Sequence, residues 1–77
     1  MARPETTLEM AERHVRDGER IVRRQREIVD QLFEHGLPVD LAAELLMEFE
    51  LTLEDHRLHL ARIIESSRAD SSSDQRA

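Results

Sequence analysis

The chain contains no cysteine, so neither a disulfide nor a thiolate metal site can stabilise its fold. It also has no tryptophan and no tyrosine, and it has only two phenylalanines, two glycines and two prolines. Aromatic side chains are common in β-strands and stack on nucleic-acid bases, so their scarcity disfavours both β-structure and base stacking. Few glycines and prolines leave few breaks in regular structure. These absences favour an all-α protein.

Lysine is also absent, and all 11 basic residues are arginines. The net charge of −6 argues against a general nucleic-acid binder. No apolar run approaches the length that crosses a bilayer, and no apolar segment follows the N-terminal Met1-Ala2-Arg3-Pro4-Glu5 as in a signal peptide. We therefore expect a cytoplasmic protein without a membrane partner.

The 77 residues divide into three predicted parts. We expect a frayed N-terminus over residues 1–5, a helical hairpin over 6–65, and a disordered serine-rich tail over 66–77. The hairpin breaks at His35-Gly36-Leu37-Pro38, where glycine suits a left-handed residue after a helix and proline suits the first turn of the next. The helices are predicted over about 6–35 and about 38–65, with the turn at 36–38. Thr6 or Thr7 caps the first helix, and either Leu37 or Asp40 caps the second.

The apolar residues of both helices recur in steps of three and four, which is the heptad pattern of a coiled coil. Folding the chain at the turn pairs them in layers whose residue numbers sum to 71. We call these layers the seam: Leu8/Ile63, Ala11/Leu60, Val15/His56, Gly18/Leu53, Val22/Phe49, Gln25/Leu46, Val29/Ala42 and Leu32/Val39. Small residues often face larger ones across it, as close packing requires.

One hairpin leaves further apolar residues outside the seam, at heptad positions that lie next to one another on the helix surface. These residues are Ile21, Ile28, Leu41, Leu45, Leu51 and Leu58. Left in water they would form a large patch for so small a protein. A homodimer forming an antiparallel four-helix bundle is the simplest way to bury it. The alternative is a monomer with scattered exposed leucines.

Three of the four histidines form a candidate metal site: His14, His56 and His59. In the predicted register His14 faces His59, and His56 lies one turn from His59. Asp17 and Asp55 lie near them, and imidazoles with carboxylates are common metal ligands. The alternative is that these histidines are ordinary polar residues of the seam and the helix surface. His35 suits the C-terminus of the first helix, where partial positive charge is favourable.

Arginines line the outer side of the first helix, at positions 13, 16, 20, 23 and 24. Such a stripe can bind phosphates or an anionic surface. The alternative is a solvated face neutralised by the many carboxylates of both helices. In this reading Glu12 lies beside Arg57 at facing positions.

Two segments carry a resemblance: AERHVRDGERIVRRQREIVDQL over 11–32 and EDHRLHLARI over 54–63. They resemble a group of short, uncharacterised proteobacterial helical-hairpin proteins, a likeness that implies a hairpin and brings no activity. Architecture also resembles the Spo0E-like aspartyl-phosphate phosphatases, but their Ser-Gln-Glu-Leu-Asp signature reads Ala-Glu-Leu-Leu-Met here at 43–47. That activity is therefore not expected.

The sequence predicts a protein that is not an enzyme and has no cofactor, because no serine or other nucleophile has an adjacent base and two helices form no cleft. We expect a small interaction or regulatory module, a homodimer that binds a protein partner. The alternatives are a metal- or pH-responsive sensor using the histidines and an anionic-surface or nucleic-acid binder using the arginine stripe.

Overall fold

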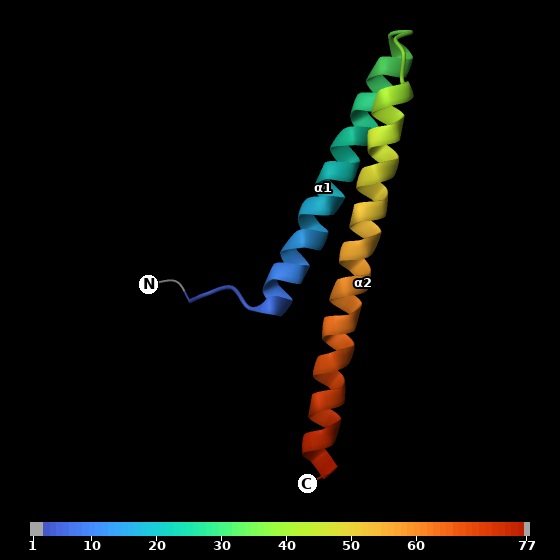
Figure 1. Cartoon of the computed structure of the whole chain (residues 1–77). Helices are drawn as coiled ribbons and strands as arrows, with labels where there is room; N and C mark the ends of the chain where they lie inside the picture. The colour runs from blue at the N-terminus through green and yellow to red at the C-terminus, as the bar shows by residue number, and fades with distance from the viewer. Residues whose placement is uncertain (1–2, 77) are drawn as a thin grey trace.

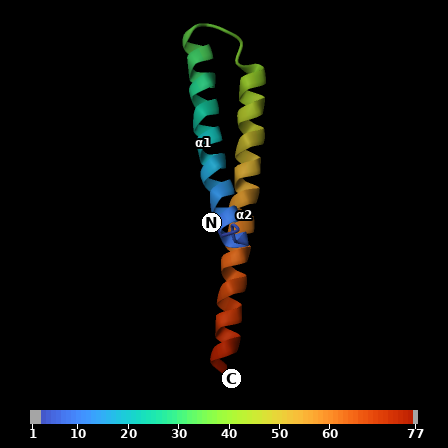
Figure 2. The ribbon, with the colours of Figure 1, turned by 90° about the vertical axis from the view of Figure 1, so that its left-hand side faces the viewer.

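The computed structural model describes residues 3–76, and over these residues it contains two α-helices and no strand. Helix α1 spans Thr7–Glu34 and helix α2 spans Asp40–Arg76. The helices run side by side in opposite directions and are joined by one short turn (Figures 1 and 2). The molecule is an elongated rod of 65 × 31 × 14 Å. The predicted all-α hairpin is confirmed.

Helix α1 begins with a reciprocal cap that its first residues encode. The Glu9 amide donates to Thr6 Oγ1 at 3.1 Å, and the Thr6 amide donates back to Glu9 Oε1 at 3.0 Å. This capping box satisfies two of the amides that a helix start leaves without partners. Thr6, rather than Thr7, is therefore the cap.

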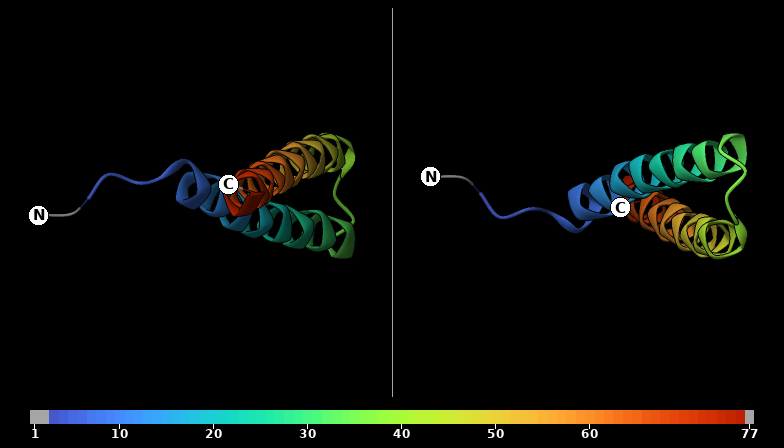
Figure 3. Two further views of the ribbon diagram at one scale, coloured as in Figure 1. Left: turned by 90° about the horizontal axis from the view of Figure 1, so that it is seen from below. Right: turned by 90° about the horizontal axis from the view of Figure 1, so that it is seen from above.

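The residues before the cap are extended and lead away from the hairpin, as the two end-on views show (Figure 3). Arg3 pairs with Glu9 at 2.8 Å, and Arg13 pairs with Glu5 at 2.8 Å. The segment predicted to fray thus makes two exposed ion pairs with the first turns of α1. Residues 1 and 2 of that predicted segment lie outside the described residues.

The turn follows the predicted glycine geometry. Gly36 has φ +66°, a left-handed conformation that glycine adopts without strain. The Gly36 amide donates to the Phe33 carbonyl at 3.1 Å and the Leu37 amide to the Leu32 carbonyl at 2.9 Å, the pair of bonds of a Schellman motif.

Helix α2 begins two residues later than predicted, at Asp40. The Ala43 amide donates to the Val39 carbonyl at 2.8 Å, so Val39 precedes the helix as its N-cap. Neither Leu37 nor Asp40 holds that position. Val39 is half-buried in the last layer of the seam, and this packing explains why an apolar residue stands where a polar cap is usual.

The predicted seam is the interior of the hairpin. Ala11, Val22 and Leu53 are its buried apolar residues, and Gln25 is buried with them. Every other seam position is half-buried except Leu8, which is 38% exposed at the open end. Across the Gly18/Leu53 layer, a Cβ placed on Gly18 would lie 3.0 Å from Leu53 Cδ1. The predicted register is therefore the observed one.

Gln25 is the polar member of this interior, and its Nε2 donates to the Ala42 carbonyl at 2.9 Å. This bond crosses from α1 to α2, so it satisfies the buried amide and ties the two helices in one register.

The end of α2 differs from the sequence expectation. The helix continues past residue 65 to Arg76, through the segment predicted to be a disordered tail. Residues 66–76 contain no glycine or proline, so the helix meets no breaker there. Figure 1 shows α2 extending well beyond the start of α1, and the predicted tail residue 77 lies outside the described part.

No described helix combines the length and the apolar character that crossing a membrane requires.

Candidate interaction surface

The two long edges of the hairpin differ in charge. We name the first the charged edge, defined by Glu19, Arg26, Glu50 and Arg57. There Arg26 pairs with Glu50 at 3.1 Å and Arg57 pairs with Glu19 at 3.7 Å, both between α1 and α2. These bridges are solvent-exposed, so each adds at most a modest stabilisation. They border a hollow of about 420 Å³ on this edge, which is lined mostly by charged groups that favour contact with water.

Arg57 therefore pairs with Glu19, one heptad from the predicted partner Glu12. The reason is geometric. Side chains of a helix lean toward its own N-terminus. On antiparallel helices, Glu12 and Arg57 lean away from each other, whereas Glu19 and Arg57 lean together. The predicted pairing omitted this tilt.

We name the opposite side the uncharged edge, defined by residues His14, Ile21, Ile28, Leu45, Thr52 and His59. None of these side chains is a carboxylate or a guanidinium. Ile21 is 46% exposed, Leu45 is 43% exposed and Ile28 is half-buried, so this aliphatic surface faces water in the single chain. Three of the six residues predicted to bind a second copy thus lie along one edge.

The other three predicted interface residues lie on α2 alone. Leu41 is 78% exposed, Leu51 is 63% exposed and Leu58 is 48% exposed. Leu51 and Leu58 are one heptad apart and point away from the seam, on the back of α2. The structure therefore places the six residues on a broad surface that includes an edge and the back of one helix.

Further exposed apolar side chains were not among the six. Phe33 and Leu37 lie beside the turn, and Met47 lies on α2. Heptad spacing gave no signal for Phe33, because its position falls on the same side as the charged edge, and none for Leu37, because it lies outside both helices.

A small hollow of about 110 Å³ opens on the uncharged edge, beside Gly18. Both helices line it, through His14, Asp17, Gly18, Ile21, Phe49, Thr52 and His56. Most of these groups are apolar or uncharged. The sequence pairing of Gly18 with Leu53 indicated close packing here but did not indicate a hollow.

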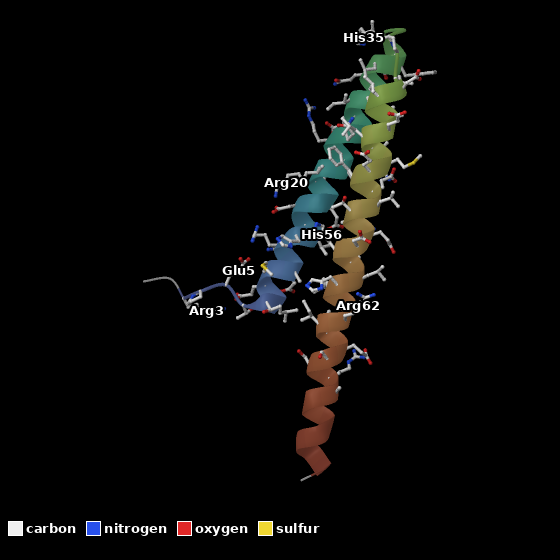
Figure 4. All side chains as sticks on the ribbon, in the orientation of Figure 1. Arg3, Glu5, Arg20, His35, His56 and Arg62 are labelled. Carbon is white, nitrogen blue, oxygen red and sulfur yellow. The ribbon has the colours of Figure 1, made fainter. Side chains whose placement is uncertain are left out.

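The hollow also brings two histidines together. The ring centroids of His14 and His56 are 5.0 Å apart and their planes meet at 43°. Figure 4 shows His56 at the junction of the two helices. His14 therefore contacts His56, not the predicted His59. His56 occupies the seam next to α1, whereas His59 lies at the rim and is exposed.

The predicted three-histidine shell is consequently not assembled. Within residues 3–69 no group of three or more histidine, aspartate or glutamate side chains is arranged to hold a metal ion. Asp17 lies beside the hollow, but its carboxylate pairs with Arg20 and lies 3.7 Å from Arg13. The arginines thus engage the carboxylate that a metal ion would need.

His35 ends α1, as Figure 4 shows at the turn. Its Nδ1 lies 2.7 Å from the Gln31 carbonyl oxygen. Because a carbonyl oxygen only accepts, Nδ1 carries the proton of this bond. This contact satisfies a carbonyl of the last turn and gives His35 the structural role expected from the sequence.

The arginine stripe is largely paired with acidic neighbours. Arg13 pairs with Glu5, Arg20 with Asp17, and Arg24 with Glu27 at 3.3 Å. The hydrogen bond from Arg13 lowers the pKa of Glu5, and the same bond raises the pKa of Arg13. At these three of the five stripe positions a phosphate would bind weakly, because it must displace the carboxylates.

Comparison of the chain with protein families, with curated proteins and with solved structures finds no match. The resemblance drawn from residues 11–32 and 54–63 therefore stays a prediction from the sequence.

Proposed function

We propose that this chain is a non-enzymatic interaction or regulatory module, a homodimeric helical hairpin that binds a protein partner. The observation that carries the proposal is the excess of aliphatic surface. Among residues 3–69, ten large apolar side chains are exposed, while three apolar residues are buried. Soluble monomers rarely leave so much apolar surface in contact with water.

The thinness of the interior also supports association. A chain of this size gains little from its own core, and no large side chain is fully buried where burial is described, over residues 3–69. Packing the residues Ile21, Ile28, Leu41, Leu45, Leu51 and Leu58 against another chain adds the burial that one seam does not supply. Fully burying one such side chain is worth about 1.5–3 kcal/mol before the costs of association.

A tagged chain used as bait in its source cells tests the partner part of this proposal. We expect specific capture that survives moderate salt, because apolar contacts are not screened by ions whereas contacts through the arginine stripe are. The control bait carries Leu51→Glu and Leu58→Glu, which place charges on the back of α2. Capture that disappears at moderate salt and is unchanged in the control would assign binding to the arginines instead.

A pH-responsive role is the second candidate, and the contact between His14 and His56 is the observation that favours it. If both rings were protonated, two positive charges would repel each other in one small hollow. Asp17, which lines the same hollow, opposes that repulsion. Thermal melting from pH 8 to pH 5 tests this role, and an identical pH response in wild type and His14→Gln would reject it.

A further inference from the structure

The exposed aliphatic surface has two parts that face different directions. Ile21, Ile28 and Leu45 belong to the uncharged edge, where both helices contribute. Leu51 and Leu58 belong to the back of α2, about 100° further around the helix. A flat partner cannot cover both parts equally, so a second copy would cover mainly one of them.

We propose that the second copy of this chain binds the uncharged edge, over the hollow beside Gly18, and leaves the back of α2 in water. This inference rests on the proposed homodimer and specifies its interface. Each copy uses the same edge, so the contact is isologous and closes at two chains.

The contrast between the edges supports this choice. Ion pairs Arg26–Glu50 and Glu19–Arg57 bridge the helices along the charged edge. Burying them would remove charged groups from water, at a cost that their attraction often fails to offset. The cost is smaller at the uncharged edge, because its positions carry only aliphatic, hydroxyl and imidazole side chains. The charged groups beside its hollow are Asp17 and the arginines that pair with it.

The hollow supplies the shape. It is partly open and has the volume of a side chain. Ile21, Phe49 and Thr52 bound it together with His14, Asp17, Gly18 and His56. An aliphatic side chain of an apposed edge fits it, and each edge carries such side chains in Ile28 and Leu45. The uncharged edge therefore contains both the hollow and aliphatic side chains that can fill the hollow of a second copy.

The area of the chain favours a second copy as the occupant. A compact protein of 9.0 kDa exposes roughly 4,900 Å², whereas this hairpin exposes 6496 Å². Part of the excess of roughly 1,600 Å² belongs to the segment before α1 and to the end of α2 beyond Ile63, and its size is comparable to the area that each chain buries in an obligate homodimer. A hairpin with so few buried residues needs a partner for its stability. A second copy is always present where the chain is made, so it can supply that burial as the chain folds.

Neighbouring residues give a matched test. Thr52 lies on the uncharged edge, Leu51 lies on the back of α2, and both are exposed in the single chain. Because the chain has no cysteine, Thr52→Cys and Leu51→Cys each carry one unique thiol. The rate of maleimide labelling is measured on each full-length variant at increasing protein concentration, with the mass followed by sedimentation. Circular dichroism checks that both variants remain helical.

As dimer forms, we expect the Thr52→Cys thiol to become at least about tenfold less reactive, while Leu51→Cys changes less than about twofold. A dimer in which Leu51→Cys is protected and Thr52→Cys is not would overturn this interface but keep the homodimer. A mass of one chain at every concentration, with both thiols equally reactive, would overturn the homodimer itself. If Thr52→Cys does not dimerise, Ile21→Cys on the same edge replaces it, with the same expected protection.

Discussion

Gly18 is the residue at which the packing of the hairpin is most restrictive. The space beyond its Cα is occupied by Leu53, whose Cβ would lie 3.6 Å from an added Cβ and whose Cδ1 would lie 3.0 Å from it. A glycine inside an exposed helix normally costs about 1 kcal/mol relative to alanine. Close approach of the two helices is the structural reason for this residue.

Replacing Gly18 with leucine should lower the free energy of unfolding by about 1–3 kcal/mol, because the new side chain collides with Leu53. Urea unfolding of Gly18→Leu, Leu53→Ala and the double variant measures the effect. In the double variant, alanine at position 53 leaves room for leucine at position 18. The loss of unfolding free energy in the double variant should therefore be smaller than the sum of the losses in the two single variants. A more stable Gly18→Leu would show that the helices do not meet at this layer.

The cap of α1 predicts a specific response to acid. The backbone hydrogen bond from Thr6, then the Thr6 hydroxyl contact and the bond from Arg3, lower the pKa of Glu9 below its ordinary value of 4.5. A carboxylate with a lowered pKa stabilises the fold fully above its ordinary value and loses that contribution as pH falls through the lowered pKa. Wild type should therefore lose stability as pH drops below 4.5.

Glu9→Gln isolates this effect, because glutamine keeps the acceptor of the capping box but does not titrate. We expect its melting temperature to fall less steeply between pH 5 and pH 3 than that of wild type, measured by circular dichroism at matched ionic strength. Parallel curves for the two proteins would place the acid response in other carboxylates.

At the scale of the helices, most of the architecture follows from sequence. The step of three and four residues, the glycine of the turn and the rule that paired numbers sum to 71 predict which residues meet, as Gly18 and Leu53 do. Periodicity succeeds here because a two-helix hairpin has only one interface, so a single register determines every layer.

What the sequence did not predict depends on side-chain direction and on helix ends. Because long side chains tilt along the helix, Arg57 pairs with Glu19 and not with Glu12. Because His59 lies at the rim, His14 contacts His56 instead. The composition of residues 66–76 indicated disorder, yet it contains no helix breaker, and the structure continues α2 through it. Local composition is a weak guide where neither packing nor a breaker decides.

Helix α2 extends beyond the first layer of the seam, which contains Leu8 of α1 and Ile63 of α2. Ending the chain after Ser66 should change the free energy of unfolding by less than about 0.5 kcal/mol. Ending it after Arg62 removes Ile63 from the seam and should cost more. Urea unfolding compares the two, and an equal loss in both would show that the end of α2 packs on the hairpin.

At the scale of the whole molecule, the hairpin combines one narrow interior with two unlike edges. The charged edge carries ion pairs around a hollow lined mostly by charged groups, and the uncharged edge carries aliphatic side chains around a smaller, mostly uncharged hollow. This difference supports the proposed association of two chains through the uncharged edge.

Sedimentation equilibrium of the unmodified chain tests this account most directly. At high micromolar concentration and neutral pH we expect twice the single-chain mass of 9.0 kDa, with dissociation on dilution accompanied by loss of helical circular dichroism. A mass of one chain throughout that range, with undiminished helical signal, would contradict the account, because the hairpin would then be stable with its uncharged edge in water.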